Sequence, residues 1–189
     1  MTAWVLVVLA GLSDFSRVSE KDGVTLEARK VAGSSWQEFR VTAVTFGKVS
    51  ELCGRAFGSG RVEPGEPHVV SRKVLSEAPN ELVTWDRIEP PLVSPRDSVV
   101  RRTRKELPGG VCRVEIHSNV KDAPPPKNGD VRIPLIDASF TFTPQEGGRV
   151  KVEHVIHTEP GGMLSPFIVE PAQRSAALGE VNRIVQALR

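Results

Sequence analysis

The sequence predicts an α+β domain in which a curled antiparallel β-sheet wraps around a long C-terminal α-helix. Most of the chain consists of short segments in which apolar and polar residues alternate, with Pro and Gly between them, which is typical of antiparallel strands with one wet face. One helical pattern interrupts these segments and a second ends the chain. A sheet with one long helix leaves least apolar surface exposed if it curls around that helix. The space enclosed in this way predicts an internal hydrophobic cavity.

The first two predicted strands, at 24–29 and 39–43, form a hairpin, with a turn signal at Gly33-Ser34 between them. A helix is predicted after them, because the next apolar residues share one helical face. They are Val49, Leu52, Cys53, Ala56 and Phe57. Further strands are predicted between breakers rich in Pro and Gly, at 68–76, 81–89, 96–106, 111–120, 131–143 and 149–158.

The last helix begins at a capping signal, with Ser165 as the N-cap and Pro166 in the first turn. Apolar residues then recur at helical spacing, namely Leu178, Val181, Val185 and Leu188. Pro171 lies inside this stretch and predicts a kink or a break, because proline removes a helical hydrogen bond. The regular part of the helix is therefore expected from about Ala172 to Leu188.

Composition places the chain among ordinary globular proteins of one domain. It has 189 residues, of which 39% are hydrophobic, and its 25 Lys and Arg against 23 Asp and Glu leave a net charge of +2. So small an excess does not supply the phosphate neutralisation that drives nucleic-acid binding. The densest basic run, Arg101 to Lys105, divides between the two faces of a strand and has no interleaved aromatic residue. We expect no nucleic-acid partner, and we expect a monomer.

The first thirteen residues are a candidate leader. Their apolar run from Ala3 to Ala10 is far shorter than the ~20 residues of a spanning helix. Its length suits the core of a signal peptide, although no Lys or Arg precedes it; the alternative is a first helix packed on the core. We expect a signal peptide at 1–13 and the folded domain at 14–189. A cleaved leader implies a secreted or periplasmic protein of a bacterial envelope, and an uncleaved one a cytoplasmic protein.

The sequence contains no clear catalytic or metal-binding motif. His154 and His157 resemble a metal pair, but residues three apart on a strand face opposite sides, so no metal site is expected. Cys53 and Cys112 each lie on an apolar face and are interpreted as inert buried thiols; a disulfide between them requires Cα atoms within ~7 Å, which the sequence does not decide. The absence of a phosphate loop and of a nucleophile motif favours binding over catalysis.

Four segments in order carry a resemblance to a known family. They are Lys21–Leu26, Ser94–Arg102, Val131–Ile133 with Pro144 beyond it, and Glu159–Pro166. They resemble the opening strand, the Pro-Arg-Asp strand and the later signatures of the START (StAR-related lipid-transfer) family of the SRPBCC superfamily. The resemblance covers about Asp14 to Leu188 and implies a bacterial-type, single-domain member with the helix-grip fold.

The resemblance also implies a ligand tunnel between the sheet and the last helix, closed by the loop that carries Gly161 and Gly162. It places a charged group inside the tunnel at Arg102, with Asp86 on the neighbouring strand as its partner. A buried guanidinium costs several kcal/mol unless it is paired; the alternative is that Arg102 is a solvated strand residue. The implied ligand-binding residues are Arg102, Asp86, Trp85, Ser98, Val100, Val114, Ile116, Met163, Leu164, Phe167 and Ile168. Arg96 and Asp97 are expected to form a structural ion pair.

The function that this resemblance implies is binding, and transfer, of a lipid or sterol-like ligand, with transient contact to a membrane surface and without a cofactor. The alternative is an enzyme similar to the polyketide cyclases and aromatases, which use a similar cavity. A strongly shifted pKa at His117, His154 or Asp137 would favour the enzyme. A third hypothesis is a sensor in which the Gly161–Gly162 loop moves on ligand binding to alter a partner surface.

Overall fold

The computed structural model describes residues 14–91, 93–118, 121, 123–127 and 129–186. In these residues, strands and helices follow one another as expected for an α+β domain. Their bounds are β1 Ser16–Lys21, β2 Val24–Lys30, β3 Gln37–Phe46, α1 Val49–Phe57, β4 Val69–Ala78, β5 Glu81–Ile88, β6 Arg96–Leu107, β7 Val111–Ser118, β8 Val131–Arg132, β9 Leu135–Gln145, β10 Arg149–Glu159 and α2 Pro166–Gln186.

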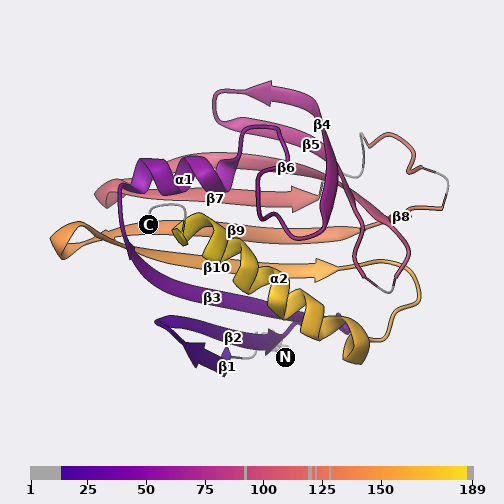
Figure 1. Cartoon of the computed structure of the whole chain (residues 1–189), viewed down its shortest axis with the longest axis horizontal. Helices are drawn as coiled ribbons and strands as arrows, with labels where there is room; N and C mark the ends of the chain where they lie inside the picture. The colour runs from indigo at the N-terminus through magenta and orange to yellow at the C-terminus, as the bar shows by residue number, and fades with distance from the viewer. Residues whose placement is uncertain (1–13, 92, 119–120, 122, 128, 187–189) are drawn as a thin grey trace, which may run out of the picture.

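The strands form one curled sheet in the order β1-β2-β3-β10-β9-β7-β6-β5-β4. Neighbours along this order are antiparallel, and the short β8 pairs with β6 in parallel. Figure 1 shows α2 crossing the sheet over β9, β10 and β3, while α1 lies over β6 and β7. We call the face that carries these helices the inner face. The predicted sheet wrapped around a C-terminal helix is confirmed, as are the β2–β3 hairpin and the early helix.

Alternation along the strands builds the core on the inner face. Phe39, Val41 and Ala43 of β3 are buried, and their polar neighbours in the strand are not. From α2, Val181 and Ile184 are fully buried against this surface. Burying an aliphatic or aromatic side chain of this size contributes ~1.5–3 kcal/mol, so this face holds the sheet and the helix together.

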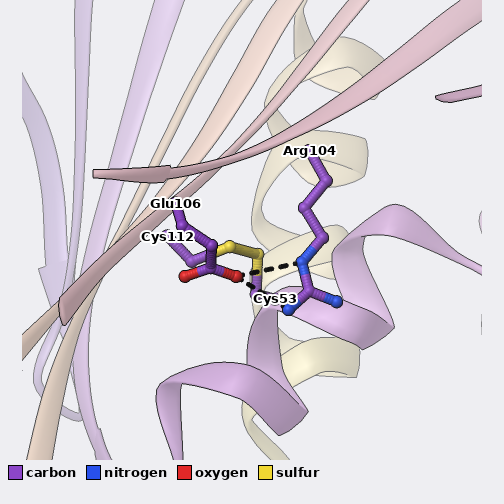
Figure 2. Close-up of a disulfide and its surroundings, with 4 residues drawn as sticks. All are labelled: Cys53, Arg104, Glu106 and Cys112. Atoms are coloured by element: carbon purple, nitrogen blue, oxygen red, sulfur yellow. Dashed lines mark hydrogen bonds and ion pairs between the residues drawn. A yellow bond between two sulfur atoms is a disulfide. The ribbon is translucent and has the colours of Figure 1, made fainter. Parts of the chain in front are cut away.

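A disulfide between Cys53 and Cys112 joins α1 to β7. The interpretation of these residues as inert thiols is wrong. The helical face that buries Leu52 and Cys53 packs against β7 and brings the two Cα atoms to 6.2 Å, within the range that a disulfide needs. Figure 2 shows the bond beside the Arg104–Glu106 ion pair of β6, in which the Arg104 Nη2 lies 2.8 Å from a Glu106 carboxylate oxygen.

The strand β1 was not predicted, several strand ends differ by a few residues, and two larger differences from the prediction lie at prolines. The helix α2 continues through Pro171 without a break, because this exposed proline, close to the start of the helix, removes only one backbone donor. The predicted strand at 131–143 is divided into β8 and β9 at Pro134, which lacks the N–H that a ladder requires. Within the described residues, no helix has the length and apolar character to cross a membrane. The candidate leader and Leu188 lie outside the described residues.

Candidate functional site

A buried polar cluster lies on the inner face where β4, β5 and β6 meet. Asp86 of β5 is paired in register with Ser98 of β6, and Thr84 with Val100, so the even-numbered residues of these strands share this face. Arg102 donates from Nη1 to the Thr84 hydroxyl oxygen at 2.8 Å. The sequence therefore placed Arg102, Asp86 and Ser98 on the same face correctly.

Arg72 of β4, which sequence reasoning missed, is the principal partner of Asp86. Its Nε and Nη2 donate to the two Asp86 carboxylate oxygens at 2.7 and 2.8 Å, and its Nη1 donates to Glu66 at 2.9 Å. Desolvation lowers the pKa of Arg72, but the hydrogen bonds with Asp86 and Glu66 outweigh it and raise that pKa above its usual value. Arg72 and Asp86 are direct cross-strand neighbours. No local pattern in the sequence pointed to this contact, because the register of β4 against β5 is shifted at two points.

Arg102 is left with a weaker contact to a carboxylate. Its Nη2 lies 3.6 Å from Asp86 Oδ2, beyond hydrogen-bond distance. The Arg102 side chain is only 12% exposed, so the alternative of a solvated strand residue does not hold. Burial lowers the pKa of Arg102, and although Asp86 raises it, the nearby charge of Arg72 lowers it further. A guanidinium has five N–H donors, so Arg102 retains donors that a ligand oxygen can use.

His154 of β10 is the second polar group on the inner face. Its ring stacks on Phe140 with 3.9 Å between ring centroids, and its Nδ1 lies 3.1 Å from the Ser139 carbonyl oxygen. Burial disfavours the charged imidazolium and lowers the pKa of His154 to about 4. The other ring nitrogen, Nε2, is buried and has no hydrogen-bond partner among the described residues.

The other groups considered for catalysis lie elsewhere. His117 Nδ1 lies 3.1 Å from Asp137 Oδ1, and both side chains are more than half exposed on the outer face. They do not meet His154, so the structure does not bring the three groups into one site. His157, three residues after His154, lies on the opposite side of β10 and contacts the Gln37 carbonyl oxygen through Nδ1 at 3.3 Å.

The expected ion pair between Arg96 and Asp97 is not formed, because adjacent strand residues face opposite sides. Asp97 instead accepts two hydrogen bonds from Arg132, at 2.8 and 2.6 Å, and one from the Trp85 Nε1 at 2.7 Å. Trp85 is thus an outer-face residue that holds Asp97, and its predicted ligand contact is wrong. Arg96 is buried, donates from Nη1 to the Ser94 carbonyl oxygen, and has no partner for Nε among the described residues.

The predicted tunnel lining is divided between core and surface. Val100 and Val114 are buried on the inner face and Ile116 packs beside them. The residues of the lid loop and the first turn of α2 behave differently. Met163, Phe167 and Ile168 are 104%, 90% and 66% exposed, so the prediction that they line the interior is wrong for this conformation, whereas Leu164 is half-buried.

The position of the lid loop explains this exposure. Gly161 and Gly162 both have φ of +71°, and a Cβ on Gly161 would lie 2.7 Å from the Arg132 carbonyl oxygen. The loop therefore lies tightly on β8 before the chain enters α2. The side chains of α2 become buried only from Ala177 onward, which leaves the first turn of the helix at the surface.

Two surface hollows in the described part of the chain can be compared with the predicted tunnel. One of about 530 Å³ lies between the β1–β3 edge and the C-terminal half of α2, with Val24, Ala43, Leu178 and Val185 among its lining residues. The other, of about 310 Å³, lies near Trp36. Neither contains a residue that was predicted to line the tunnel. The tunnel stays a prediction.

Comparisons with known proteins agree with this architecture. A family model described as the START domain matches residues 71–189. A STAR-related lipid transfer protein fragment from Xanthomonas axonopodis is 22% identical, with a TM-score of 0.83 over 93% of this chain and 98% of that chain. The human StarD13 (DLC2) lipid transfer and protein localization domain is 21% identical, with a TM-score of 0.78 over 93% of this chain and 89% of that one. At these identities the structural likenesses show the fold.

A more distant likeness is to the Zhui aromatase/cyclase from Streptomyces, which is 12% identical and has a TM-score of 0.53 over 80% of this chain and 95% of that chain. No curated protein matches the chain in sequence. The fold is thus shared by lipid transfer proteins and by an aromatase/cyclase, and only the residues of the site can distinguish the two activities.

Proposed function

Because the chain belongs to the START domain family, we propose that it binds a mostly apolar ligand by one polar head, between the inner face of the sheet and α2. Membership of this family supports hydrophobic ligand binding in general. The observation that carries the finer proposal is Arg102, a buried guanidinium whose nearest carboxylate, on Asp86, is 3.6 Å away and already accepts two hydrogen bonds from Arg72.

The proposed binding energy comes from two sources. Moving the apolar body of the ligand out of water contributes roughly 25 cal/mol per Å² of buried surface. An acceptor oxygen on the head, in a hydroxyl, a carboxylate or a phosphate, supplies the hydrogen bond that Arg102 lacks. Charge-assisted hydrogen bonds of this kind are stronger than those between neutral groups, so Arg102 selects for ligands with an acceptor head.

Transfer requires release at another surface, and we assign that surface to the start of α2. Met163, Phe167 and Ile168 are exposed apolar residues beside the lid loop. Isolated exposed apolar residues are common, but a group of them next to the loop that would close the interior is suited to insertion into a membrane interface. Contact with lipid can then draw the lid and α2 away from the sheet and open the interior.

The head-group proposal is tested with the variant Arg102→Leu. We expect it to lose most of its affinity for hexadecanoic acid and to retain its affinity for hexadecane. The matched control is Arg101→Leu, because Arg101 lies on the opposite face of β6 and pairs with Glu81 at 2.7 Å. Equal affinity of the Arg102→Leu variant and the wild type for hexadecanoic acid would count against the anchoring role. Native mass spectrometry of protein from its own host, searched for co-purified lipid, identifies the physiological ligand.

The transfer proposal is tested separately from binding. Phe167→Ser should slow movement of a fluorescent fatty acid between vesicles and leave its equilibrium affinity unchanged. The control is Phe46→Ser, because Phe46 is also exposed, at 69%, but lies at the far end of β3 beside Arg149. If both variants transfer at the wild-type rate, the start of α2 is not the membrane contact.

A second candidate function, a cyclase or aromatase, is favoured by one observation. His154 is a buried histidine with a strongly lowered pKa, and such groups gather at catalytic sites. Its Nδ1 is engaged with a backbone carbonyl, and no carboxylate contacts its Nε2 among the described residues. Conversion of a linear poly-β-ketone thioester into ring products by the wild type, lost in His154→Phe, would establish the enzyme instead of the carrier.

We also propose that the protein folds in an oxidising compartment, as a secreted or periplasmic protein. A buried disulfide between α1 and β7 supports this, because structural disulfides form and persist outside the reducing cytosol. N-terminal sequencing of the native protein should then find a start between Gly11 and Asp14. A native chain that begins at Met1 would contradict export by a cleaved leader.

A further inference from the structure

Among the described residues, no group hydrogen-bonds to His154 Nε2, although the Glu180 carboxylate of α2 lies near enough for its charge to act on the ring. In the sheet, His154 is opposite Phe140 of β9 on one side and Val41 of β3 on the other, and both are buried apolar residues. The helix that covers this face contributes Ala177 and Val181, which are also apolar and buried. A buried polar atom without a partner is uncommon in native proteins and calls for an explanation, such as a bound ligand.

The hydrogen bond of the other nitrogen decides what Nε2 can do. Nδ1 faces the Ser139 carbonyl oxygen at 3.1 Å, and a carbonyl oxygen only accepts, so Nδ1 carries the proton. Burial keeps the ring neutral at physiological pH, since it lowers the pKa of His154 to about 4. Nε2 then presents a lone pair and no hydrogen. It can accept a hydrogen bond from a hydroxyl, and it cannot bind a ketone or an ether.

The position of His154 relative to Arg102 adds a distance requirement. Arg102 is paired in register with Ile116 of β7. Ile116 is paired in turn with Ala138 of β9, and Ala138 with Ile156 of β10. His154 precedes Ile156 by two residues and lies on the same face. With about 4.8 Å between neighbouring strands, the two polar groups are roughly 15 Å apart along the curled sheet. The strand residues between them on this face, Ile116, Ala138 and Ile156, are apolar, while Glu180 of α2 acts by its charge on both Arg102 and His154.

We propose that His154 Nε2 accepts a hydrogen bond from a hydroxyl on the ligand, remote from the head that Arg102 binds. This inference rests on the proposed function and deepens it by naming the ligand class, which is a lipid hydroxylated partway along its apolar body. Arg102 recognises an acceptor and His154 recognises a donor. The two contacts together set the orientation of the ligand and the distance between its polar groups.

The test compares three probes with the same carboxylate head. They are octadecanoic acid, 12-hydroxyoctadecanoic acid and 12-oxooctadecanoic acid. At carbon 12 the first has no polar group, the second has a hydroxyl that can donate a hydrogen bond, and the third has a ketone that can only accept one. The wild type should bind the hydroxy acid about three- to tenfold more tightly than either of the others, as expected for one added hydrogen bond. In His154→Phe this preference should disappear, while His154→Gln, which supplies an amide oxygen acceptor, should keep part of it.

Controls separate this inference from the proposed function. His117→Phe changes an exposed outer-face histidine and should leave the hydroxyl preference intact, and Arg102→Leu should weaken all three probes equally. If the wild type binds none of the probes and no other lipid, the proposed function fails. If it binds all three alike, or if His154→Phe keeps the preference for the hydroxy acid, only the role of His154 is overturned.

A measurement on the wild type covers the case in which His154→Phe does not fold. In protein labelled with ¹⁵N, the Nε2 signal of His154 should shift when 12-hydroxyoctadecanoic acid is added. It should not shift in the same direction with octadecanoic acid, because that ligand brings no donor. An unchanged Nε2 signal at a concentration that saturates the protein with the hydroxy acid would refute the hydrogen bond.

Discussion

Reduction of the Cys53–Cys112 disulfide is predicted to destabilise the protein strongly. The bond closes a loop across 59 residues of sequence separation. For a loop of this length, loss of chain entropy in the unfolded state corresponds to roughly 4 kcal/mol. Native domains are stable by about 5–15 kcal/mol in total. The disulfide is therefore expected to supply a large share of the stability of this fold.

The assay is equilibrium unfolding in guanidinium chloride, followed by tryptophan fluorescence of the oxidised and the fully reduced protein. The double variant Cys53→Ala/Cys112→Ala should resemble the reduced protein. Glu106→Gln is the control, since it breaks the neighbouring Arg104–Glu106 pair, whose Glu106 side chain is 64% exposed, and exposed pairs of this kind contribute ~0–1 kcal/mol. Equal free energies of unfolding for oxidised and reduced protein would refute the reasoning, as would two free thiols in the denatured protein without reductant.

The burial of the bond adds a kinetic expectation. Both cysteines are 0% exposed, so a reductant reaches the sulfur atoms only when α1 opens from the sheet. The rate of reduction of the native protein should then become independent of reductant concentration once opening limits it.

Four more predictions concern the interior and the lid. His154 stays neutral in the folded protein down to a pKa of about 4, against 6.5 ordinarily. The unfolded chain takes up this proton first, so the contribution of His154 is full above pH 6.5 and falls by about 3 kcal/mol as the pH drops to 4, with Glu180 opposing the pKa shift. A urea titration across this range should show a fall about 3 kcal/mol smaller in His154→Phe, which keeps the loss from Glu27, Glu115 and Asp130, whose pKa values are lowered by their cationic partners. Arg72→Leu removes the hydrogen-bonding partner of Asp86 and Glu66, leaves Asp86 with only the 3.6 Å contact to Arg102, and should cost ~3–5 kcal/mol in thermal unfolding. Arg102→Leu should cost far less, because Arg72 still holds Asp86. Asp97→Asn weakens the paired hydrogen bonds from Arg132 and should lower the melting temperature. The control is Ser71→Ala, and an equal change in melting temperature in the two variants would contradict this prediction. Gly161→Ala should destabilise more than Gly162→Ala, since both have φ of +71° but only the first places its Cβ within 2.7 Å of backbone; equal losses would show that backbone conformation alone decides.

Strand positions and faces followed from the sequence because they depend on neighbouring residues. Alternation placed Arg102 and Ser98 on one face of β6 and Arg101 on the other, the family resemblance added Asp86 as the partner of Arg102, and the structure places Asp86 on the same face. The direction of a side chain along a strand has a period of two residues, so it is encoded locally. The polar cluster was predictable to this extent.

Pairings between distant segments depended on the packed molecule. The bond of Cys53 to Cys112, the capture of Asp86 by Arg72 and the pairing of Asp97 with Arg132 each join elements whose separation no local pattern specifies. The same holds for Met163 and its exposed neighbours, since their direction depends on how the lid loop lies against β8. Local alternation and helical spacing were sufficient to predict a curled sheet around a terminal helix, and the family resemblance added a charged group on its inner face. Which charges meet, which sulfurs bond and which apolar residues reach solvent were settled by contacts that form only when the chain is folded.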